Sequence, residues 1–310
     1  MYRKIIGFLE AWKESEYRKP LILQGARQVG KTYSILEFGR THYENVAYFN
    51  FETNPKLNDA FAENIDPDYL IPILSGIARQ TIVKGKTLIV FDEVQFCERA
   101  LASLKYFCED APEHHIIAVS SLLGVAVNRT KFSFPVGKVD IKTLYPMDME
   151  EFMLALGEED LVAQIKECFS TNTPLPSALH DAAMQFYRQY LVLGGMPKCV
   201  MQFAETKDYI LVRHTQDTIL ASYLNDMSKY NNLNEIKKTR LAYDNITVQL
   251  SKKNTRFQYK LIKKGGRASE FENAIEWLCL SGIVSQVYKV EQIKKPLENY
   301  RDIDAFKIYV

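Results

Sequence analysis

The sequence lacks any apolar run near the ~20 residues that a membrane-spanning helix requires, although 47% of its 310 residues are hydrophobic. No long apolar segment follows Arg3 and Lys4, so the N-terminus does not fit a signal peptide. The five cysteines are scattered and form no C-x-x-C pair, which favours reduced thiols over disulfides or a metal site. We therefore expect a cytoplasmic protein with no membrane partner.

The sequence also lacks an overall charge of one sign, because 39 Lys and Arg side chains are balanced by 38 Asp and Glu side chains. This balance argues against strong polyanion binding by the chain as a whole. The distribution is uneven, because residues 232–310 hold 15 basic and 9 acidic side chains. If any part contacts nucleic acid, we expect it to be this C-terminal third.

The most informative stretch runs from Gly25 to Thr32 and fits the pattern G-x-x-x-x-G-K-[ST] at every fixed position. Glycines let backbone N–H groups wrap phosphates, Lys31 can neutralise the β- and γ-phosphates, and the Thr32 hydroxyl can hold Mg²⁺. The pattern also occurs by chance, but here a short apolar run precedes it and a helical pattern follows. We therefore predict an ATP and Mg²⁺ site. Its predicted nucleotide-binding residues are Gly25, Ala26, Arg27, Gln28, Val29, Gly30, Lys31 and Thr32.

Two carboxylates, Asp92 and Glu93, end the apolar run that begins at Thr87. The run predicts a buried parallel strand, and ligands of open α/β sheets bind at the carboxyl ends of such strands. We predict that Asp92, with Thr32, holds Mg²⁺ and that Glu93 orients and deprotonates the attacking water. An exposed acidic turn is the alternative, which the phosphate loop ~60 residues earlier disfavours.

Weaker candidates follow the next apolar run, which ends at Ser120 and Ser121. If that strand lies between the phosphate-loop strand and the Asp92 strand, one serine reaches the γ-phosphate or the attacking water. We take Ser121 as the candidate, with capping of the next helix as the alternative. Arg129 precedes a strand that we expect near Val136 to Leu144. It is a candidate arginine finger because a guanidinium is planar and always ionised, although most arginines are simply solvated.

Several of these motifs together resemble a known family. They are Arg27-Gln28-Val29-Gly30-Lys31-Thr32, Asp92-Glu93-Val94-Gln95, Ser121-Leu122-Leu123 and the segment from Tyr190-Leu191 to Pro197, in that order. The chain resembles prokaryotic predicted ATPases of the AAA superfamily that carry a C-terminal domain of unknown function. The resemblance implies that Pro197 packs on the adenine base, and a Gly-Pro helix start is the alternative. It also implies that longer relatives continue into a nuclease-like domain, before which this sequence stops at Val310.

The predicted fold class is α/β, a P-loop NTPase of the AAA type. We expect an ATP-binding domain with a parallel sheet flanked by helices at residues 1–150, a helical lid at 151–231 and a winged-helix-like module at 232–310. In the module, Ser269 and Glu272 fit a capping box, and Phe271, Ala274, Ile275 and Leu278 share one helix face. A predicted strand at Ile283–Val290 follows.

A basic segment precedes this helix and contains no acidic residue. Its cations are Lys252, Lys253, Arg256, Lys260, Lys263, Lys264 and Arg267. DNA and an acidic protein partner both fit the segment, because Glu270, Glu272 and Glu276 on the helix would repel phosphates. The predicted function is Mg²⁺-dependent ATP hydrolysis, coupled to movement of the lid and the winged helix. The alternatives are a slow-turnover ATP switch and a DNA-binding regulator that acts through the winged helix.

Overall fold

A computed structural model describes residues 1–121, 134–230, 233–253 and 256–309. The chain divides into two compact units, of which one holds the described residues up to Ile219 and the other those from Leu220 onward. Helix α11 (Tyr209–Tyr230) contains the boundary between them. In the part of the chain that the structure covers, no helix is both long and apolar enough to span a membrane.

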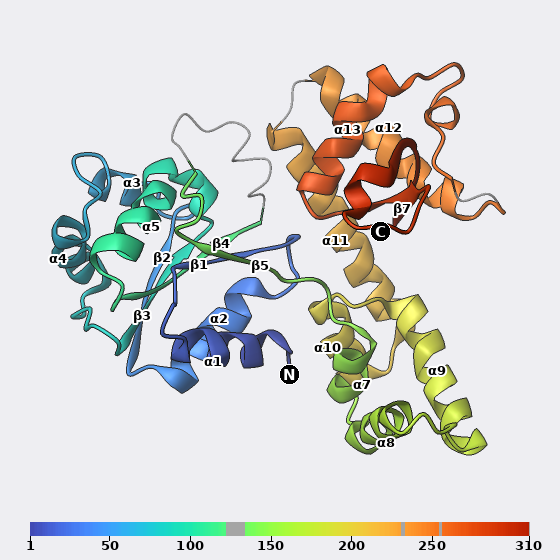
Figure 1. Cartoon of the computed structure of the whole chain (residues 1–310), viewed down its shortest axis with the longest axis horizontal. Helices are drawn as coiled ribbons and strands as arrows, with labels where there is room; N and C mark the ends of the chain where they lie inside the picture. The colour runs from blue at the N-terminus through green and yellow to red at the C-terminus, as the bar shows by residue number, and fades with distance from the viewer. Residues whose placement is uncertain (122–133, 231–232, 254–255, 310) are drawn as a thin grey trace. The chain divides into compact units, whose positions relative to one another are not determined.

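The first unit is built on a five-stranded sheet in the order β2-β3-β4-β1-β5 (Figure 1), and every neighbouring pair is parallel. The strands are β1 (Leu21–Gln24), β2 (Asn45–Asn50), β3 (Thr87–Asp92), β4 (His115–Ser120) and β5 (Asp140–Thr143). Every residue of β3 and β4 is buried, as expected of parallel strands covered on both faces. The predicted α/β class is confirmed.

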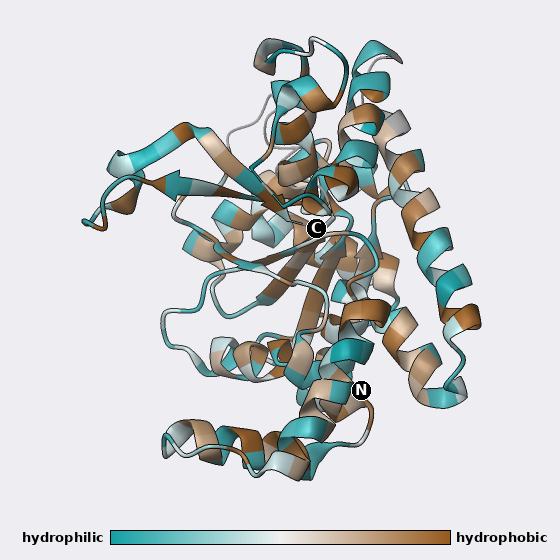
Figure 2. Cartoon of the chain, turned by 90° about the vertical axis from the view of Figure 1, so that its right-hand side faces the viewer, coloured by the Kyte–Doolittle hydropathy of each residue, from teal (hydrophilic) through white to brown (hydrophobic). Residues whose placement is uncertain are grey.

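Helices cover both faces of this sheet: α1 and α2 lie on one side, and α3, α4 and α5 on the other (Figure 1). They are α1 (Ile5–Glu14), α2 (Lys31–His42), α3 (Leu57–Ala60), α4 (Pro67–Ala78) and α5 (Glu98–Asp110), with a short 3-10 turn, η1 (Val94–Phe96). The buried rings of Phe51, Phe61 and Phe91 meet edge to face and join the α3 segment to the sheet. Figure 2 shows the hydrophobic strands between helices of mixed hydropathy.

One strand differs from its prediction. The apolar pattern placed a strand near residues 136–144, but β5 begins only at Asp140, and Pro135 to Lys138 form a turn closed by a backbone hydrogen bond of 3.1 Å. None of the four residues of β5 is buried, because it is the edge strand beside β1. Burial of apolar residues therefore does not set its limits.

The helices after the sheet also belong to the first unit. They are α7 (Met149–Ala155), α8 (Glu159–Ser170), α9 (Ser177–Leu193) and α10 (Pro197–Thr206). Helix α7 begins with a capping box, in which the Glu151 N–H donates to Asp148 Oδ1 and the Asp148 N–H donates to Glu151 Oε2. Gly195 lies so close to Met147 that an added Cβ would stand 2.0 Å from the Met147 carbonyl oxygen. This contact joins the start of α10 to the start of α7.

The second unit packs the end of α11 and two further helices against a two-stranded antiparallel hairpin. Its further elements are α12 (Leu233–Leu250), η2 (Tyr259–Leu261), α13 (Ala268–Leu280), β6 (Ser285–Val290), η3 (Leu297–Tyr300) and β7 (Arg301–Tyr309). Phe271, Leu278 and Phe306 are among the buried residues of its core. The predicted apolar face of α13 is confirmed, but the predicted cap is wrong. The helix begins one residue before Ser269, and its N-cap Arg267 is extended and makes no side-chain capping bond.

Candidate nucleotide site

The phosphate-loop pattern forms the connection between β1 and α2. Gly25 has a φ of 150°, Gln28 of 65° and Gly30 of 91°. A Cβ at Gly25 would stand 2.1 Å from the Leu144 carbonyl oxygen, so only glycine fits between β1 and the end of β5. Gly30 is the N-cap of α2 and is left-handed, which again favours glycine. The two fixed glycines of the pattern are therefore needed for the shape of the loop.

Lys31 opens α2 with a side chain that is only 6% exposed. Its ammonium donates to the carbonyl oxygens of Gly25 and Ala26, both at 2.8 Å, inside the loop. Burial lowers the pKa of Lys31 from 10.5 to about 8, and the nearby charges of Glu93 and Asp92 oppose this shift. A buried cation in the concave side of a glycine loop is an electrostatic match for a phosphate anion.

The Asp92 carboxylate, at the end of β3, accepts several hydrogen bonds. Thr32 Oγ1 donates to Asp92 Oδ2 at 3.1 Å, and Asn50 Nδ2 donates to the same oxygen at 3.3 Å. The Tyr48 hydroxyl also donates to Oδ2, and burial together with this bond raises the pKa of Tyr48 to about 12. The Glu93 N–H donates to Oδ1 at 3.0 Å. The Thr32 hydroxyl and the Asp92 carboxylate supply the hard oxygen ligands that Mg²⁺ prefers, so these residues fit the ion.

Glu93 follows directly, with a φ of 52° that is uncommon for a residue other than glycine. Its Oε2 accepts a hydrogen bond of 2.9 Å from Ser121 Oγ and another from Gln95 Nε2. Gln95 Oε1 in turn accepts a hydrogen bond of 2.8 Å from Ser120 Oγ. As the sequence predicted, β4 lies between β3 and β1, so Ser120 and Ser121 lie at the carboxyl ends of the central strands. Each makes a different contact in one connected network.

The remaining candidates are placed as follows. Pro197 is the first residue of α10, and its Cγ would be 3.6 Å from a Cβ built on Gly30, so the structure brings it to the phosphate loop. Arg27 lies 3.7 Å from the Glu52 carboxylate through its Nη2 atom. Arg129 lies outside the described residues.

Four residues of this site were missed in the sequence. Tyr48 and Asn50 are two residues apart on β2, so their side chains lie on the same face of the strand. Asn50 pairs with Asp92 in the register of β2 and β3, and this pairing brings both side chains near the Asp92 carboxylate. Gln95 lies two residues after Glu93, in the short turn η1. Arg3 donates to the Val29 carbonyl at 2.8 Å, and nothing in the local sequence indicates such a contact. Asn50 could have been found from its position as the last residue of β2, because ligands bind at the carboxyl ends of such strands. The contacts of Tyr48 and Arg3 depend on tertiary packing.

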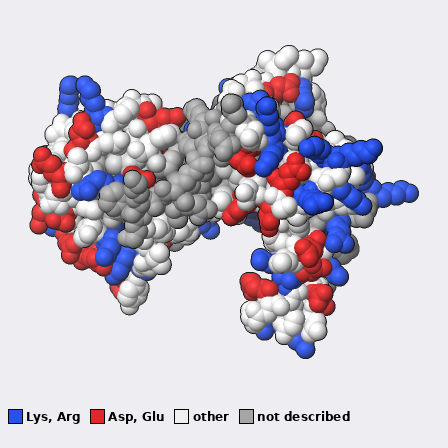
Figure 3. All heavy atoms as spheres, turned by 90° about the horizontal axis from the view of Figure 1, so that it is seen from above, with Lys and Arg blue, Asp and Glu red and all other residues white. Residues whose placement is uncertain are grey.

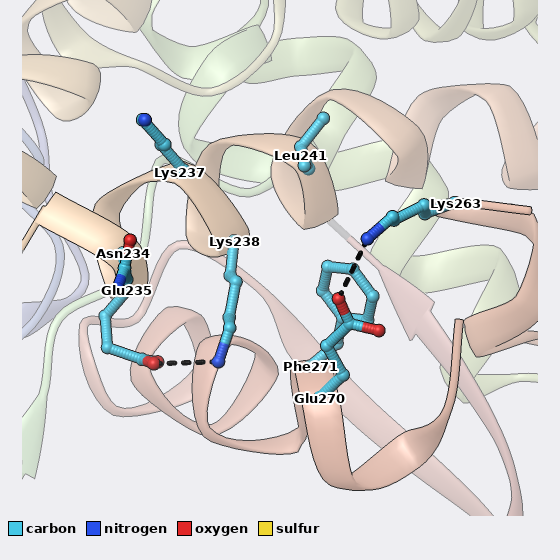
Figure 4. A pocket seen from close by; sticks show the side chains of 8 residues that line it. All are labelled: Asn234, Glu235, Lys237, Lys238, Leu241, Lys263, Glu270 and Phe271. Atoms are coloured by element: carbon cyan, nitrogen blue, oxygen red, sulfur yellow. Dashed lines mark hydrogen bonds and ion pairs between the residues drawn. The ribbon is translucent and has the colours of Figure 1, made fainter. Parts of the chain in front are cut away.

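The basic segment lies in the second unit, and its cations are partly paired. Lys263 lies 3.4 Å from the Glu270 carboxylate, and Arg256 donates to the Asp304 carbonyl at 3.0 Å. Figure 3 shows acidic side chains interspersed among the lysines and arginines rather than a uniformly basic face. A hollow of about 410 Å³ lies beside Lys263. Its lining residues are Asn234, Glu235, Lys237, Lys238, Leu241, Lys263, Glu270 and Phe271 (Figure 4).

Comparisons with known proteins agree with the observed fold. Residues 17–153 match the family model of an AAA domain, and residues 184–310 match that of a domain of unknown function (DUF8612). The fold resembles the Walker-type ATPase of Pyrococcus abyssi, with a TM-score of 0.58 and 14% identity over 99% of this chain and 93% of that one. The Aeropyrum pernix ORC2 protein, solved as ADPNP–ADP complexes, has a TM-score of 0.52 and 13% identity, with 99% and 90% covered. At such identities the likeness shows the fold alone. No curated protein matches the sequence.

Proposed function

We propose that this chain, whose residues 17–153 match the family model of an AAA domain, is a protein of the AAA superfamily that binds and hydrolyses ATP with Mg²⁺. The observation that carries the proposal is the buried Lys31 ammonium, held within a glycine loop at the start of a helix. Burying a charge is costly unless a partner compensates it. Phosphate groups in the loop would be that partner, and the helix N-terminus adds favourable N–H groups.

The nucleotide would be held by the loop from Gly25 to Thr32, and the metal by Thr32 and Asp92. Bound Mg²⁺ neutralises phosphate charge that develops during phosphoryl transfer. Thr32 Oγ1 and Asp92 Oδ2 already lie 3.1 Å apart and face each other. The Tyr48 and Asn50 donors on β2 fix the orientation of the Asp92 carboxylate. Pro197, close to Gly30, is proposed to pack on the base.

Glu93 is the proposed general base, and Ser121 is the proposed contact to the reacting phosphate or water. In this arrangement Ser121 and Gln95 both donate to one oxygen of Glu93, so they orient the carboxylate. A carboxylate with a free lone pair on its other oxygen can accept the proton of an attacking water. A pure nucleotide switch has no need for a base beside the metal-binding aspartate, which favours turnover over the switch alternative.

We further propose that residues 1–150 form the ATPase core, 151–231 a helical lid and 232–310 a winged-helix-like module. The nucleotide state is proposed to change the position of the lid. The contact of Pro197 with the loop and that of Gly195 with Met147 support a link between the loop and the lid helices. In the module, the cations of the basic segment support DNA binding. The rival proposal is a protein partner, which the Lys263–Glu270 pair supports because Glu270 neutralises Lys263 and would repel phosphates. Localisation in the cytoplasm remains part of this proposal.

The test is direct. We expect wild-type protein to bind ATP in calorimetry and to release phosphate from Mg·ATP in steady state, measured with and without duplex DNA. Lys31→Ala should remove nucleotide binding while the protein stays folded, because the charge on the β- and γ-phosphates is lost. Unchanged ATP affinity in a folded Lys31→Ala variant would refute the assignment of the loop.

A further inference from the structure

A buried arginine holds the phosphate loop from outside its motif. Arg3 precedes α1 and is only 4% exposed, and three of its nitrogens donate hydrogen bonds to three separate segments. Nη1 donates to the Val29 carbonyl in the loop at 2.8 Å, and Nη2 donates to the Tyr145 carbonyl after β5 at 2.8 Å. Nε donates to Glu151 Oε1 in the first turn of α7 at 3.1 Å. One side chain therefore joins the loop, the end of the sheet and α7.

The chemistry of these contacts requires a guanidinium. Its donors diverge within one rigid plane, so it can reach three acceptors at once, which a lysine ammonium on a flexible stem cannot do in this geometry. Glu151 compensates the charge and is itself buried. The same carboxylate also accepts hydrogen bonds from the N–H groups of Lys4 and Asp148, at 2.7 Å and 3.2 Å. The pair is therefore well satisfied.

The contact with Val29 has a direct consequence for phosphate binding. In a trans peptide the carbonyl and the next N–H point in opposite directions. With the Val29 carbonyl held toward Arg3, the N–H of Gly30 must point away from Arg3. Phosphate loops bind anions through N–H groups turned inward, so the orientation of this peptide affects affinity. Gly30 has a left-handed backbone conformation, and a Cβ built on it would be 3.4 Å from Arg3 Nη1. The Arg3 guanidinium therefore packs directly against the Gly30 backbone.

We propose that Arg3 is a positioning residue of the nucleotide site, which together with Glu151 presets the Val29–Gly30 peptide and ties it to α7. This inference rests on the proposed nucleotide binding. Arg3 touches neither phosphate nor metal in this account. Its effect on affinity passes through the loop backbone, which the hydrogen bond from Arg3 Nη1 to the Val29 carbonyl holds, while the ion pair with Glu151 fixes the guanidinium in place. A buried pair adds little net stability by itself, which fits a role in fixing a conformation.

The decisive variant is Arg3→Lys, because it keeps a positive charge for Glu151 but gives up the fixed donor to Val29. We expect ATP and ADP to bind it roughly tenfold to a hundredfold more weakly, the range for losing a hydrogen bond to a charged group. At saturating ATP, kcat should change by less than about twofold, because the reacting groups are untouched. The control is Arg18→Lys. Arg18 is a half-buried arginine that also donates to two carbonyls, those of Lys13 and Pro112.

Unfolding is the main confounding effect, since Arg3→Met leaves a buried Glu151 without its partner. The double variant Arg3→Met/Glu151→Gln removes both charges and keeps one side-chain oxygen, which can replace Oε1 as acceptor of the Lys4 N–H, while the 3.2 Å bond from the Asp148 N–H is given up. We expect it to recover most of the thermal stability that Arg3→Met loses while its nucleotide affinity stays low. A purely structural role predicts that affinity returns with stability.

The outcomes separate this inference from the proposed function. If wild type and Arg18→Lys bind ATP and folded Arg3→Lys binds it equally well, Arg3 has no positioning role, although the nucleotide site stands. Recovery of wild-type affinity in the double variant would refute the inference in the same way. If the wild type binds no nucleotide, the proposed function fails first and this inference fails with it.

Discussion

Replacing Lys31 by methionine separates the cost of burying a charge from the affinity that the charge provides. Burial lowers the pKa of Lys31 from 10.5 to about 8 in the nucleotide-free protein. One pKa unit corresponds to about 1.4 kcal/mol, so the shift represents about 3 kcal/mol. Methionine has a similar length and no charge. The Lys31→Met variant should therefore lack this pH-dependent part of the free energy of unfolding.

The sign follows from proton binding. The unfolded chain keeps the Lys31 proton up to about pH 10.5, whereas the folded chain releases it near pH 8. Between these values the unfolded state carries more protons, so the free energy of unfolding rises with pH. Below pH 8 both states are protonated, and the full burial cost is present. The stability of wild type relative to Lys31→Met should thus increase by up to about 3 kcal/mol across this window.

Urea unfolding at a series of pH values between about 7 and 10.5 measures this difference, and other titrating groups cancel between the two proteins. Exposed Lys56, replaced by methionine, is the matched control. Phosphates favour the charged form of Lys31, so ATP binding above pH 8 should take up a proton and weaken as pH rises. Calorimetry in two buffers of different ionisation enthalpy detects the uptake. Parallel stability curves for wild type and Lys31→Met would refute the reasoning.

The other predictions concern catalysis and the basic segment. Glu93→Gln should keep Mg·ATP binding but slow hydrolysis by ~10²-fold or more, and wild-type turnover in that variant would assign the base elsewhere. Gln95→Ala removes one of the donors that orient Glu93, so kcat should fall roughly tenfold at unchanged ATP affinity; a change in affinity alone would contradict this role. Replacing Lys263, Lys264 and Arg267 by glutamine should weaken DNA binding equally across sequences and flatten its salt slope by up to about three units. Absence of salt-dependent DNA binding in wild type would favour an acidic protein partner.

Local patterns in the sequence were sufficient for the sheet and for the loop. The phosphate-loop pattern works within eight residues, and its glycines are needed for backbone conformations that the structure confirms at Gly25 and Gly30. The buried run before Asp92 predicted a central strand, because a strand covered on both faces is apolar along its whole length. Local patterns failed at positions that are not buried, where the alternation of apolar and polar residues does not mark the limits of an element. The edge strand β5 is shorter than predicted, and Ser269 does not cap α13.

By itself, the sequence was enough to name the candidate side chains for phosphate and metal, because these groups lie within short motifs whose spacing follows from backbone geometry. Only the tertiary structure decided what surrounds them. Tyr48 reaches Asp92 through the register of β2 and β3, and Pro197 reaches Gly30 although 167 residues separate them in sequence. Arg3 and Glu151 are 148 residues apart and meet in a buried ion pair beside the loop. Such contacts depend on how distant elements of the chain pack together. The same packing buries the Lys31 side chain, and this burial lowers its pKa.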